Sequence, residues 1–496
     1  MKERIFGTEC EYAPAYHSKD SSRIAQLNGE ELLNHIKGLS ALLFSSLKRK
    51  GYPLVGDFLG NGGRLYIDRS GHPEYATPEC RRVEDLVAYE RAGDRIVQEL
   101  TETAHPFITD NNVPPKLHIF KNNVDYYGNT YGGHENYLAT PKAVDEIRHM
   151  IPFLVTRQIF AGTGRVSTHR EAGDVSYQIS QRADFINHTF SDRTSKVRGI
   201  INTRKREIYR QGQNRRLHII VGDSNMSEAA IGLKIGTTVL VLRLLDEGGL
   251  DDIPTLASPV KALKSISRSW DSGIRLEGRK GRYTALDVQT LYLEKIGRFF
   301  ASRSPTPEEA DIMALWAKIL DGLSRLKVSK RNWILEDDPD RLRRKIDWVL
   351  KLWLLNRYGN MAEQTVNDRR LRLLDFKYHD LDPTTGLFAK CEALGLVDRM
   401  VDDDAIRRAQ THPPKNTRAR IRGAVIHMAA NRNIEVQIED WEKINIRAKG
   451  KRTGIAHLFN HQKGIVNQLG IRLDDPFKAL DASIFEQIEH FVEVWG

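Results

Sequence analysis

Alternating apolar and polar residues predict strands in the first half of the chain. Between residues 64 and 68, Leu65 and Ile67 alternate with three polar residues, which are Arg64, Tyr66 and Asp68. Because successive side chains of a strand point to opposite faces, one face can enter a core. The other face then presents a cation, a phenol and a carboxylate in a row. That mixture favours a functional site over an ordinary surface strand.

A second predicted strand, RIFGTECEYA, opens the chain and carries two glutamates. Glu9 and Glu11 are separated by one residue, so their carboxylates share one face. Like charges so close repel each other unless a cation lies between them. Glu74 follows the turn that the Gly-His-Pro run at 71–73 predicts. These oxygen ligands, with no Cys or His pairing, favour Mg²⁺ or Mn²⁺ over zinc. The alternative is an exposed strand with salt-bridged glutamates.

The same patterns predict further elements before residue 224. Strands are expected at 116–120 (KLHIF) and 215–223 (RRLHIIVGD). Residues 31–52 have the composition of a helix that ends near Gly51. The segment 121–138 is turn-rich, with Asn, Asp and Gly at loop positions and a His-Glu-Asn run near its end. Regular strand–helix alternation is absent, so a Rossmann fold is not expected.

From about Ser224 onward the pattern becomes helical. The run AAIGLKIGTTVLVLRLLDEG predicts a buried helix. In PTPEEADIMALWAKILDGLSRL, apolar residues recur at spacings of three and four, which marks a helix with one core-facing stripe. The stripe consists of Ile312, Leu315, Trp316, Ile319 and Leu323. A following helix repeats the spacing with Ile346, Val349, Leu350 and Trp353.

A Pro pair and a charge run at 412–423 (HPPKNTRARIRG) predict a domain boundary. We therefore divide the chain into a catalytic domain, 1–415, and a small C-terminal domain, 416–496. The last predicted element, SIFEQIEHFVEVW, has helical spacing of its apolar residues.

Composition and charge narrow the class of protein. The 496 residues include three cysteines without a CxxC pair, which favours a reducing cytoplasm. Cys10 and Cys80 are interpreted as packing residues rather than nucleophiles. No run of about 18 apolar residues is present, and MKERIFGTECEY does not resemble a signal peptide, so no membrane association is expected.

The net charge of +10 is concentrated in the segment 193–216. A basic patch can contact nucleic-acid phosphates, yet no helix-turn-helix, zinc finger or RNP motif accompanies it. An acidic protein partner or nucleotide phosphates explain the same charge, and nucleic acid is not expected as a partner. No P-loop is present either, so ATP would have to be held differently.

Taken together, a series of blocks resembles one family, the Pup ligases and Pup deamidases, relatives of glutamine synthetase and glutamate–cysteine ligase. The blocks run in order from residue 7 to residue 481 and are specific only in combination. They are GTECEY, NGGRLYIDRSGHPEYATPEC, FKNNVD, YGGHENYL, PFLVTRQ, SQRADFI, GIINTR, RRLHIIVGDSNMSE, LKIGTT, NTRARIRG and DPFKALD.

The resemblance implies a fold and a set of site residues. The fold would be α+β: a glutamine synthetase-like curved antiparallel β-sheet cradle packed with helices, followed by a small C-terminal domain. The cofactors would be ATP and Mg²⁺. The matching positions imply Asp68 as the catalytic base, Glu9, Tyr66 and Glu74 around Mg²⁺, and Arg64, Thr77 and Trp441 at the nucleotide. For Asp68, a metal ligand or an ion-pair partner of Arg64 remains the alternative.

The implied reaction links a small protein modifier to other proteins. ATP would phosphorylate the side-chain carboxylate of the C-terminal glutamate of a Pup-like modifier. A lysine of a target protein would then attack the γ-glutamyl phosphate and form an isopeptide bond, after Asp68 takes its proton. The implied partners are the modifier, lysine-bearing target proteins and, indirectly, a bacterial proteasome. The basic surface suits an acidic, disordered modifier.

A deamidase that hydrolyses the C-terminal glutamine amide or the isopeptide bond is the main alternative. Deamidases resemble the ligases but carry a long extra loop between the two site strands, whereas only 52 residues separate Glu11 from Arg64 here. GDSNMSE and YGNTYGGHENYL resemble the ligase, while GTECEY and RGIINTR resemble the deamidase. The ligase is favoured. A Pup-binding scaffold without activity and a ligase acting on a small molecule are less favoured still.

One segment departs from both branches of the family. After INTR the family usually continues with an acidic, histidine-bearing stretch, whereas this chain has KREIYRQGQ. We assign no role to this basic loop after Arg204.

Overall fold

The chain is described by a computed structural model. The residues it describes are 4–16, 29–107, 116–125, 128–168, 175–193, 197–203, 214–329, 333–337, 339–359, 369–432, 434–448, 468–479 and 482–495. The basic loop after Arg204, at 204–213, lies outside them, as do 194–196 of the basic segment.

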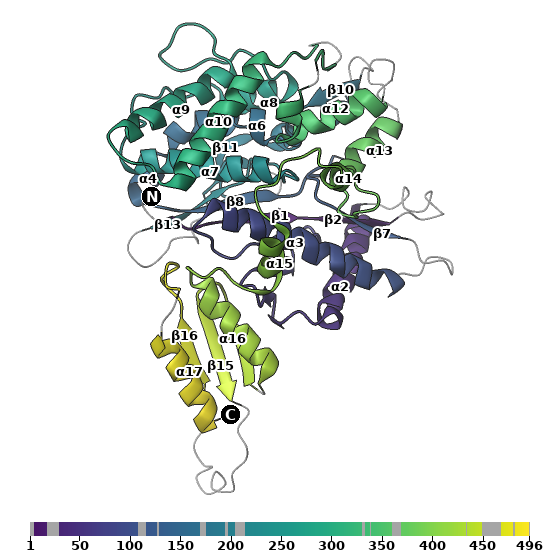
Figure 1. The fold of residues 1–496 in the computed structure, drawn as a ribbon, viewed down its shortest axis with the longest axis vertical. Coiled ribbons are helices and arrows are strands. Elements are labelled where there is room, and N and C mark those ends of the chain that lie inside the picture. Colours follow the sequence, from purple (N-terminus) through teal and green to yellow (C-terminus); the bar gives the residue numbers. More distant parts are fainter. Residues whose placement is uncertain are drawn as a thin grey trace, which may run out of the picture.

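A nine-stranded sheet runs through the middle of the molecule (Figure 1). Its order is β11-β12-β13-β8-β1-β6-β5-β4-β3, and β11 pairs parallel with β12 while the other neighbours pair antiparallel. The strands are β1 (Phe6–Glu11), β3 (Leu54–Val55), β4 (Phe58–Leu59), β5 (Arg64–Ile67), β6 (Pro73–Ala76), β8 (Gly133–Ala139), β11 (His188–Ser191), β12 (Gly199–Asn202) and β13 (Arg215–Ile219).

Among the described residues, two antiparallel sheets of two strands each accompany the large one. β2 (Ala13–Tyr16) pairs with β7 (Leu117–Phe120), and β9 (Arg165–Thr168) pairs with β10 (Val175–Gln178). The strands predicted at 116–120 and 215–223 are therefore present as β7 and β13. The turn-rich interpretation of 121–138 was wrong for its last part, because β8 lies there at the centre of the large sheet, between β1 and β13.

Helices cover the large sheet, some packed on its strands and others on the first helices. They are α2 (Gly29–Lys50), α3 (Val83–Ala104), α4 (Pro141–Asp145), α5 (Ile151–Thr156), α6 (Gln158–Ala161), α7 (Glu228–Asp246), α8 (Pro259–Arg268), α9 (Ala285–Ala301), α10 (Pro307–Arg325), α11 (Asp340–Arg343), α12 (Asp347–Gly359), α13 (Arg369–Tyr378), α14 (Leu387–Ala393) and α15 (Asp403–Thr411). Short 3₁₀ turns lie at His105–Phe107, Ile147–Met150 and Ala183–Phe185. Helices α3 and α7 contact the central strands directly.

Two hydrophobic clusters lie between the sheet and these helices. The larger contains Phe6, Tyr137, Leu217 and Ile219 from the strands, together with residues of α3, α5, α7, α9, α10 and α12. The second contains Cys10, Leu65 and Tyr75, packed on α2 and α3. Burial of these side chains leaves the opposite face of the same strands to their polar neighbours.

Most helical predictions match the structure. Helix α2 ends at Lys50, next to Gly51 with its positive φ of 80°, and α7 is buried along nearly its whole length. The stripe on α10 buries Ile312, Trp316, Ile319 and Leu323. The prediction that Ile67 points into the core together with Leu65 was wrong. Ile67 is the last residue of β5 and is 37% exposed, because the chain turns away from the core there.

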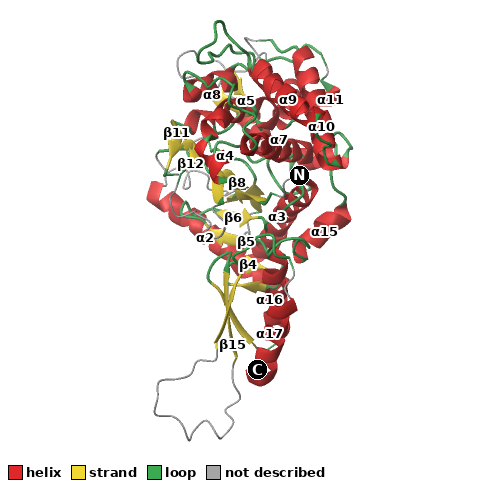
Figure 2. Cartoon of the chain, turned by 90° about the vertical axis from the view of Figure 1, so that its left-hand side faces the viewer, coloured by secondary structure: helices red, strands yellow, loops and turns green. Residues whose placement is uncertain are grey.

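The C-terminal part forms a compact unit below the sheet (Figure 2). It consists of α16 (Ala419–Asn431), a three-stranded sheet of β14 (Ile434–Ile438), β15 (Lys443–Ala448) and β16 (Gln468–Arg472), and α17 (Ala482–Trp495). This C-terminal unit has its own hydrophobic cluster, and α16 contacts β3 and β4 at the edge of the large sheet. Among the described residues, no helix combines the length and apolar character that crossing a membrane requires.

Candidate active site

Cross-strand register brings the predicted acidic residues together. Glu11 of β1 lies opposite Glu74 of β6, and Glu74 lies opposite Tyr66 of β5. Directly paired residues share one face of a sheet, so these side chains form a row on the polar face. The Tyr66 phenol lies close enough to the Glu74 carboxylate to act on its pKa. Three of the residues singled out from the sequence therefore meet as the alternation predicted.

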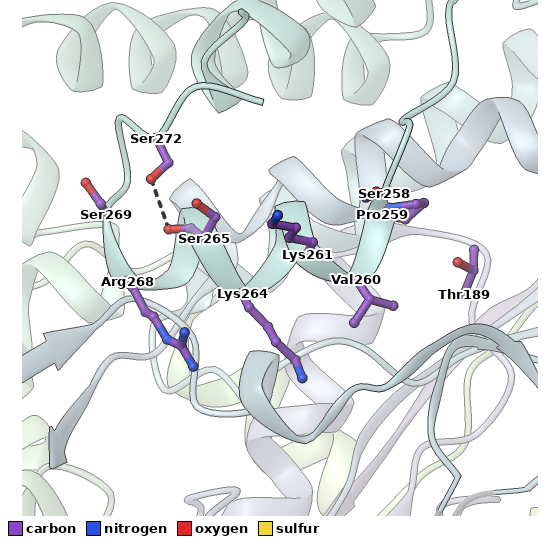
Figure 3. Close-up of a pocket in the computed structure, with 10 residues that line it drawn as sticks. All are labelled: Thr189, Ser258, Pro259, Val260, Lys261, Lys264, Ser265, Arg268, Ser269 and Ser272. Atoms are coloured by element: carbon purple, nitrogen blue, oxygen red, sulfur yellow. Dashed lines mark hydrogen bonds between the residues drawn. The ribbon is translucent and has the colours of Figure 1, made fainter. Parts of the chain in front are cut away.

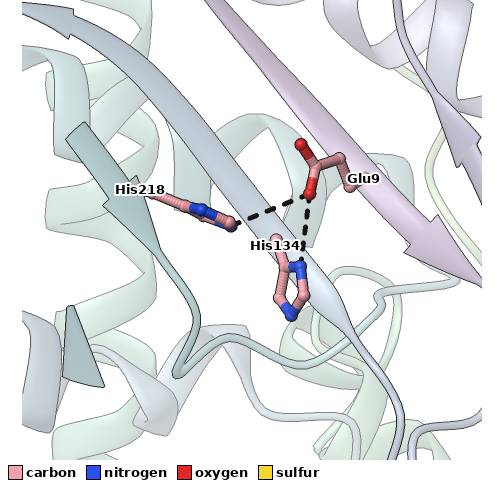
Figure 4. A group of neighbouring side chains, drawn as sticks. All are labelled: Glu9, His134 and His218. Atoms are coloured by element: carbon pink, nitrogen blue, oxygen red, sulfur yellow. Dashed lines mark hydrogen bonds and ion pairs between the residues drawn. The ribbon is translucent and has the colours of Figure 1, made fainter. Parts of the chain in front are cut away.

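The neighbouring strands add side chains that sequence reasoning missed. His134 of β8 lies opposite Glu9, and its Nδ1 is 3.3 Å from the Glu9 carboxylate. His218 comes from β13, the next strand beyond β8, and its Nε2 is 3.7 Å from the same oxygen (Figure 4). Asn136 donates to the second oxygen of Glu9 at 3.1 Å, and Arg216 lies 3.4 Å from that oxygen. Glu9 is thus surrounded by donors, whereas Glu11 and Glu74 face each other.

This arrangement pushes the pKa values of the carboxyl groups apart. Burial raises the pKa of Glu74 well above its usual value, and the charges of Glu9 and Glu11 raise it further. Burial and the charge of Asp68 raise the pKa of Glu11. Burial opposes ionisation of Glu9 too, but the His134 hydrogen bond and the charges of His218 and Arg216 hold its pKa below the usual range. The negative charge of Glu9 is therefore balanced by neighbouring donors and cations, whereas the charges of Glu11 and Glu74 are not.

The donor atoms on this face fit a divalent cation. Among the described residues, three sets of side chains place their ligand atoms within 4.8 Å of one another. The sets are Glu9, His134 and His218; Glu11, Glu74 and His134; and Glu11, Asp68 and His72. The buried Oδ1 of Asn136 has no hydrogen-bond partner among the described atoms, which suits a cation ligand. Two histidines that the sequence reasoning did not include therefore lie beside Glu9.

Asp68 lies at the end of β5, in the turn that leads to β6. Its carboxylate accepts hydrogen bonds from Ser70 and from the backbone of His72. Arg64 pairs instead with Asp57 at 2.9 Å. The alternative of an Arg64–Asp68 ion pair is therefore not what the structure contains.

Arg64 lies at an aromatic edge of the site. Its guanidinium lies over the ring of Tyr66, 4.4 Å from the centroid, and 5.4 Å from that of Phe58 on β4. Phe58 in turn meets Trp441 edge to face, with centroids 5.1 Å apart. Trp441 comes from the loop between β14 and β15, so the C-terminal unit reaches the end of the sheet that carries Arg64. Aromatic rings beside a cation are a suitable surface for a nucleotide base and phosphate.

Thr77 does not join this group. It follows β6 directly and is 5% exposed. Its hydroxyl accepts a hydrogen bond from the backbone nitrogen of Thr8 at 3.0 Å, while its own nitrogen donates to the Thr8 carbonyl. In this structure the Thr77 side chain therefore ties β6 to β1.

A buried ion cluster fixes the C-terminal unit to the sheet. Glu79 accepts from Arg418 at 2.6 Å and from Arg422 on α16. Arg422 also donates to the carbonyls of Gly62 at 2.7 Å and Trp441 at 3.0 Å. Burial alone would raise the pKa of Glu79, yet the two arginines lower it to about 2. The pKa of Arg422 is lowered by burial, but a guanidinium remains charged in proteins. These three residues, Glu79, Arg418 and Arg422, are called the clamp below. The clamp holds the Trp441 loop against the edge of the site.

The two cysteines near the site are packing residues. Cys10 and Cys80 are free and buried. Burial raises the pKa of the Cys10 thiol to about 12, and that of Cys80 well above its usual value. Neither thiol is ionised at neutral pH, which argues against a nucleophilic role.

A basic hollow lies apart from the carboxylates (Figure 3). It has a volume of about 720 Å³ and is lined by α8 with Lys261, Lys264 and Arg268, and by Thr189 of β11. None of the predicted site residues lines it. Its positive charge lies near the β11 edge of the sheet, at the opposite end from Trp441.

Comparison with known proteins gives a match to one family model and to relatives that share one name. A family model described as "Pup-ligase protein" matches residues 4–445. The chain belongs to this family. It is 38% identical over 401 residues to a Pup--protein ligase of Acidimicrobium ferrooxidans, an alignment that covers 80% of the chain and 85% of the relative. It is 36% identical to a Pup--protein ligase of a Nocardioides species, covering 99% of the chain and 100% of the relative.

Two solved structures resemble the whole fold. The complex between the prokaryotic ubiquitin-like protein Pup and its ligase PafA superposes with a TM-score of 0.82 at 29% identity, covering 100% of this chain and 93% of that one. PafA in complex with ADP gives a TM-score of 0.75 at 29% identity, with 95% of each chain covered. The predicted Pup-ligase family and the α+β fold class are confirmed.

Proposed function

We propose that this chain is an ATP-dependent ligase that joins the side-chain carboxylate of the C-terminal glutamate of a Pup-like modifier to lysines of target proteins. The observation that carries the proposal is the polar sheet face: buried carboxylates at its centre, Asp68 beside them, and a cationic aromatic edge at Arg64 and Trp441. The names of the relatives and of the two PafA structures favour the ligase over the deamidase.

Glu9, Glu74 and Tyr66 are proposed to hold Mg²⁺, with His134 and Asn136 as further donors on the same face. A divalent cation there would neutralise negative charge that accumulates during phosphoryl transfer. The raised pKa of Glu74 supports this assignment, because a nearby cation stabilises the ionised carboxylate that burial and the charges of Glu9 and Glu11 disfavour.

At the other end of the face, Arg64 and Trp441 are proposed to bind ATP. The Arg64 side chain is about one-third exposed and can meet a phosphate, while Trp441 offers a ring for the base. The resemblance also assigns Thr77 to the nucleotide. Its hydroxyl is engaged with Thr8 in this structure, so Thr77 is the one of the three whose placement adds no support.

The chemistry proceeds in two steps. A carboxylate is a poor acyl donor, so the γ-phosphoryl group of ATP is first transferred to the modifier's glutamate, giving a γ-glutamyl phosphate and ADP. A lysine ammonium then loses a proton to Asp68, and its neutral amine attacks the γ-carbonyl carbon. The C–N bond forms as the C–O bond to phosphate breaks. The nitrogen gives up its second proton to the departing phosphate, which leaves as hydrogen phosphate. Positioned proton transfer of this kind contributes roughly 10²- to 10⁴-fold to a rate.

We further propose that residues 416–496 act as a domain that completes the nucleotide site. Their separate hydrophobic cluster and the clamp of Glu79 with Arg418 and Arg422 support this division. The three buried free cysteines suit a reducing cytoplasm. A bacterial proteasome as the destination of the conjugates stays a prediction.

The proposal is tested by incubating the protein with ATP, Mg²⁺, a lysine-bearing acceptor and a modifier that ends in Glu or in Gln. Intact mass spectrometry is expected to show the acceptor enlarged by the modifier minus water, with ADP released, only for the Glu form. Asp68→Asn is expected to lower the rate by roughly 10²- to 10⁴-fold. Conversion of the Gln form to the Glu form without an adduct would identify the deamidase instead.

A further inference from the structure

The turn that carries Asp68 is closed by its own backbone. Asp68 donates its backbone N–H to the His72 carbonyl at 3.0 Å, and Gly71 donates to the Asp68 carbonyl at 3.1 Å. Gly71 has a φ of 89°, a left-handed conformation that a glycine adopts without strain. The turn is therefore a rigid loop between β5 and β6 rather than a free connection.

Within this turn the two oxygens of the Asp68 carboxylate have different surroundings. Oδ1 accepts from the Ser70 hydroxyl at 2.7 Å and from the His72 backbone N–H at 2.9 Å. Oδ2 accepts from the Ser70 backbone N–H at 2.9 Å, its one hydrogen bond among the described residues. Oδ1 is thus occupied by two donors, while Oδ2 keeps a lone pair for another proton donor.

The Ser70 hydroxyl also connects Asp68 to the imidazole of His72. Ser70 Oγ lies 2.9 Å from His72 Nδ1. An ionised carboxylate can only accept, so the single hydroxyl hydrogen points to Asp68. The hydroxyl oxygen must then accept from His72, which places the imidazole proton on Nδ1. The result is a directed chain from His72 through Ser70 to Asp68.

His72 itself is held in place. Its side chain is 8% exposed, and its ring packs against Tyr131 with centroids 4.5 Å apart. The Tyr131 carbonyl is in turn bound by the buried guanidinium of Arg182. The chain from His72 to Asp68 therefore starts from a fixed ring and not from a mobile surface histidine.

We propose that Ser70 and His72 are positioning residues for Asp68, which orient its carboxylate so that Oδ2 takes the proton from the incoming lysine. This inference rests on the proposed ligase function. In the ligation step the lysine N–H bond breaks and the proton moves to Oδ2, while Oδ1 stays bound to the hydroxyl of Ser70. Loss of the hydroxyl leaves the carboxylate with only its two backbone hydrogen bonds, from Ser70 and His72, which loosens its orientation and lengthens the proton transfer.

Two different roles for the same cluster lead to different predictions. The hydrogen bonds could serve only to close the turn, in which case every activity of the site depends on them equally. Alternatively, Glu11, Asp68 and His72 could bind a cation, since their ligand atoms lie within 4.8 Å of one another. Ser70 Oγ is 3.5 Å from a Glu11 oxygen, so removing it would then change the metal dependence.

The test compares two amine acceptors in the full-length protein with ATP, Mg²⁺ and a modifier ending in Glu. A lysine-bearing peptide is protonated at neutral pH and needs a base. Hydroxylamine is already unprotonated and captures the same γ-glutamyl phosphate as a hydroxamate without one. Ser70→Ala keeps the backbone N–H of residue 70 but removes the hydroxyl.

We expect Ser70→Ala to lower kcat for lysine by roughly 10- to 100-fold, with hydroxamate formation and the KM for ATP unchanged. Ser70→Thr restores the hydroxyl and the lysine rate. His72→Asn, whose amide can donate to Ser70, retains more lysine activity than His72→Ala. The deficit of Ser70→Ala also shrinks as the pH approaches about 10, where lysine loses its proton unaided.

Three results would overturn the inference. An unchanged lysine rate in Ser70→Ala removes the positioning role, and equal losses with both acceptors leave only a structural turn. A deficit that disappears at high Mg²⁺ concentration identifies a cation site instead. Ser324→Ala, an exposed serine on α10, serves as the matched control. If the unsubstituted protein gives neither conjugate nor hydroxamate, the proposed function fails, and this outcome is distinct from the others.

Discussion

Two glutamates only five residues apart in sequence, one buried and one mostly buried, experience opposite surroundings. Glu79 lies between Arg418 and Arg422, and its pKa is lowered to about 2. Glu74 faces Glu11 and lies near Glu9, and burial together with their charges raises its pKa. A paired carboxylate adds to stability, while a crowded one costs stability until a ligand arrives. The opposite pKa shifts therefore distinguish a stabilising ion cluster around Glu79 from the proposed active site around Glu74.

The largest effect is expected from breaking the compensated cluster. Arg422→Ala leaves Glu79 buried with one arginine fewer, and removing one partner of a buried ion pair costs about 3–5 kcal/mol. Urea denaturation followed by circular dichroism measures this loss in the free energy of unfolding. Arg432→Ala removes a partner of Glu489 from an exposed pair, which costs about 0–1 kcal/mol. Equal losses in both variants would show that the clamp carries no special weight.

The pH dependence of stability gives the next largest effect. The pKa of a glutamate in an unfolded chain is about 4.3, and that of Glu79 in the folded protein is about 2. A depressed pKa stabilises the folded state fully above the unfolded value and loses that contribution as the pH falls toward the folded value. Glu79 is therefore expected to contribute about 3 kcal/mol at pH 7, lost between about pH 4.3 and 2.

That contribution is measured as the difference in free energy of unfolding between the unsubstituted protein and Glu79→Gln across this pH range. The difference is expected to narrow as the pH falls. A difference that stays constant down to pH 2 would mean that the charge of Glu79 is not what stabilises the C-terminal unit.

The smallest of the three effects is expected from Mg²⁺ binding at the crowded carboxylates, Glu74 and Glu11. Mg²⁺ at one hundred times its dissociation constant is expected to raise the free energy of unfolding by about 2.7 kcal/mol relative to EDTA. Glu74→Gln removes a ligand and should abolish most of the rise. Glu435→Gln, an exposed position on β14, should leave it intact. A rise that persists in Glu74→Gln would place the cation elsewhere.

Local patterns were enough to predict one half of this site. Alternation alone put Glu9 and Glu11 on one face, and the turn after Asp68 returned Glu74 to the same side. The many short blocks, taken together, identified the family, and the resemblance then assigned Trp441 to the nucleotide site. Thr77 came only from that resemblance, and its hydroxyl is used between strands.

The other half depends on pairing that no local pattern encodes. His134 reaches Glu9 because β8 pairs with β1 across more than a hundred residues, and the turn-rich composition before it concealed the strand. For His218 a signal existed, since Arg216 and His218 alternate with Leu217 and Ile219 along β13. The partnership of Glu79 with Arg418 and Arg422 likewise arises from tertiary packing and has no signature in either segment alone.

The order of strands in the sheet has a consequence for synthesis of the protein on the ribosome. β1 precedes the other described strands in the chain but occupies the middle of the sheet, so it must await β6 and then β8 as its neighbours. Until then its unpaired edges could join those of another nascent chain. Charged side chains suppress such pairing. The charges of Glu9 and Glu11 are therefore expected to oppose aggregation of the emerging chain, in addition to their place in the site.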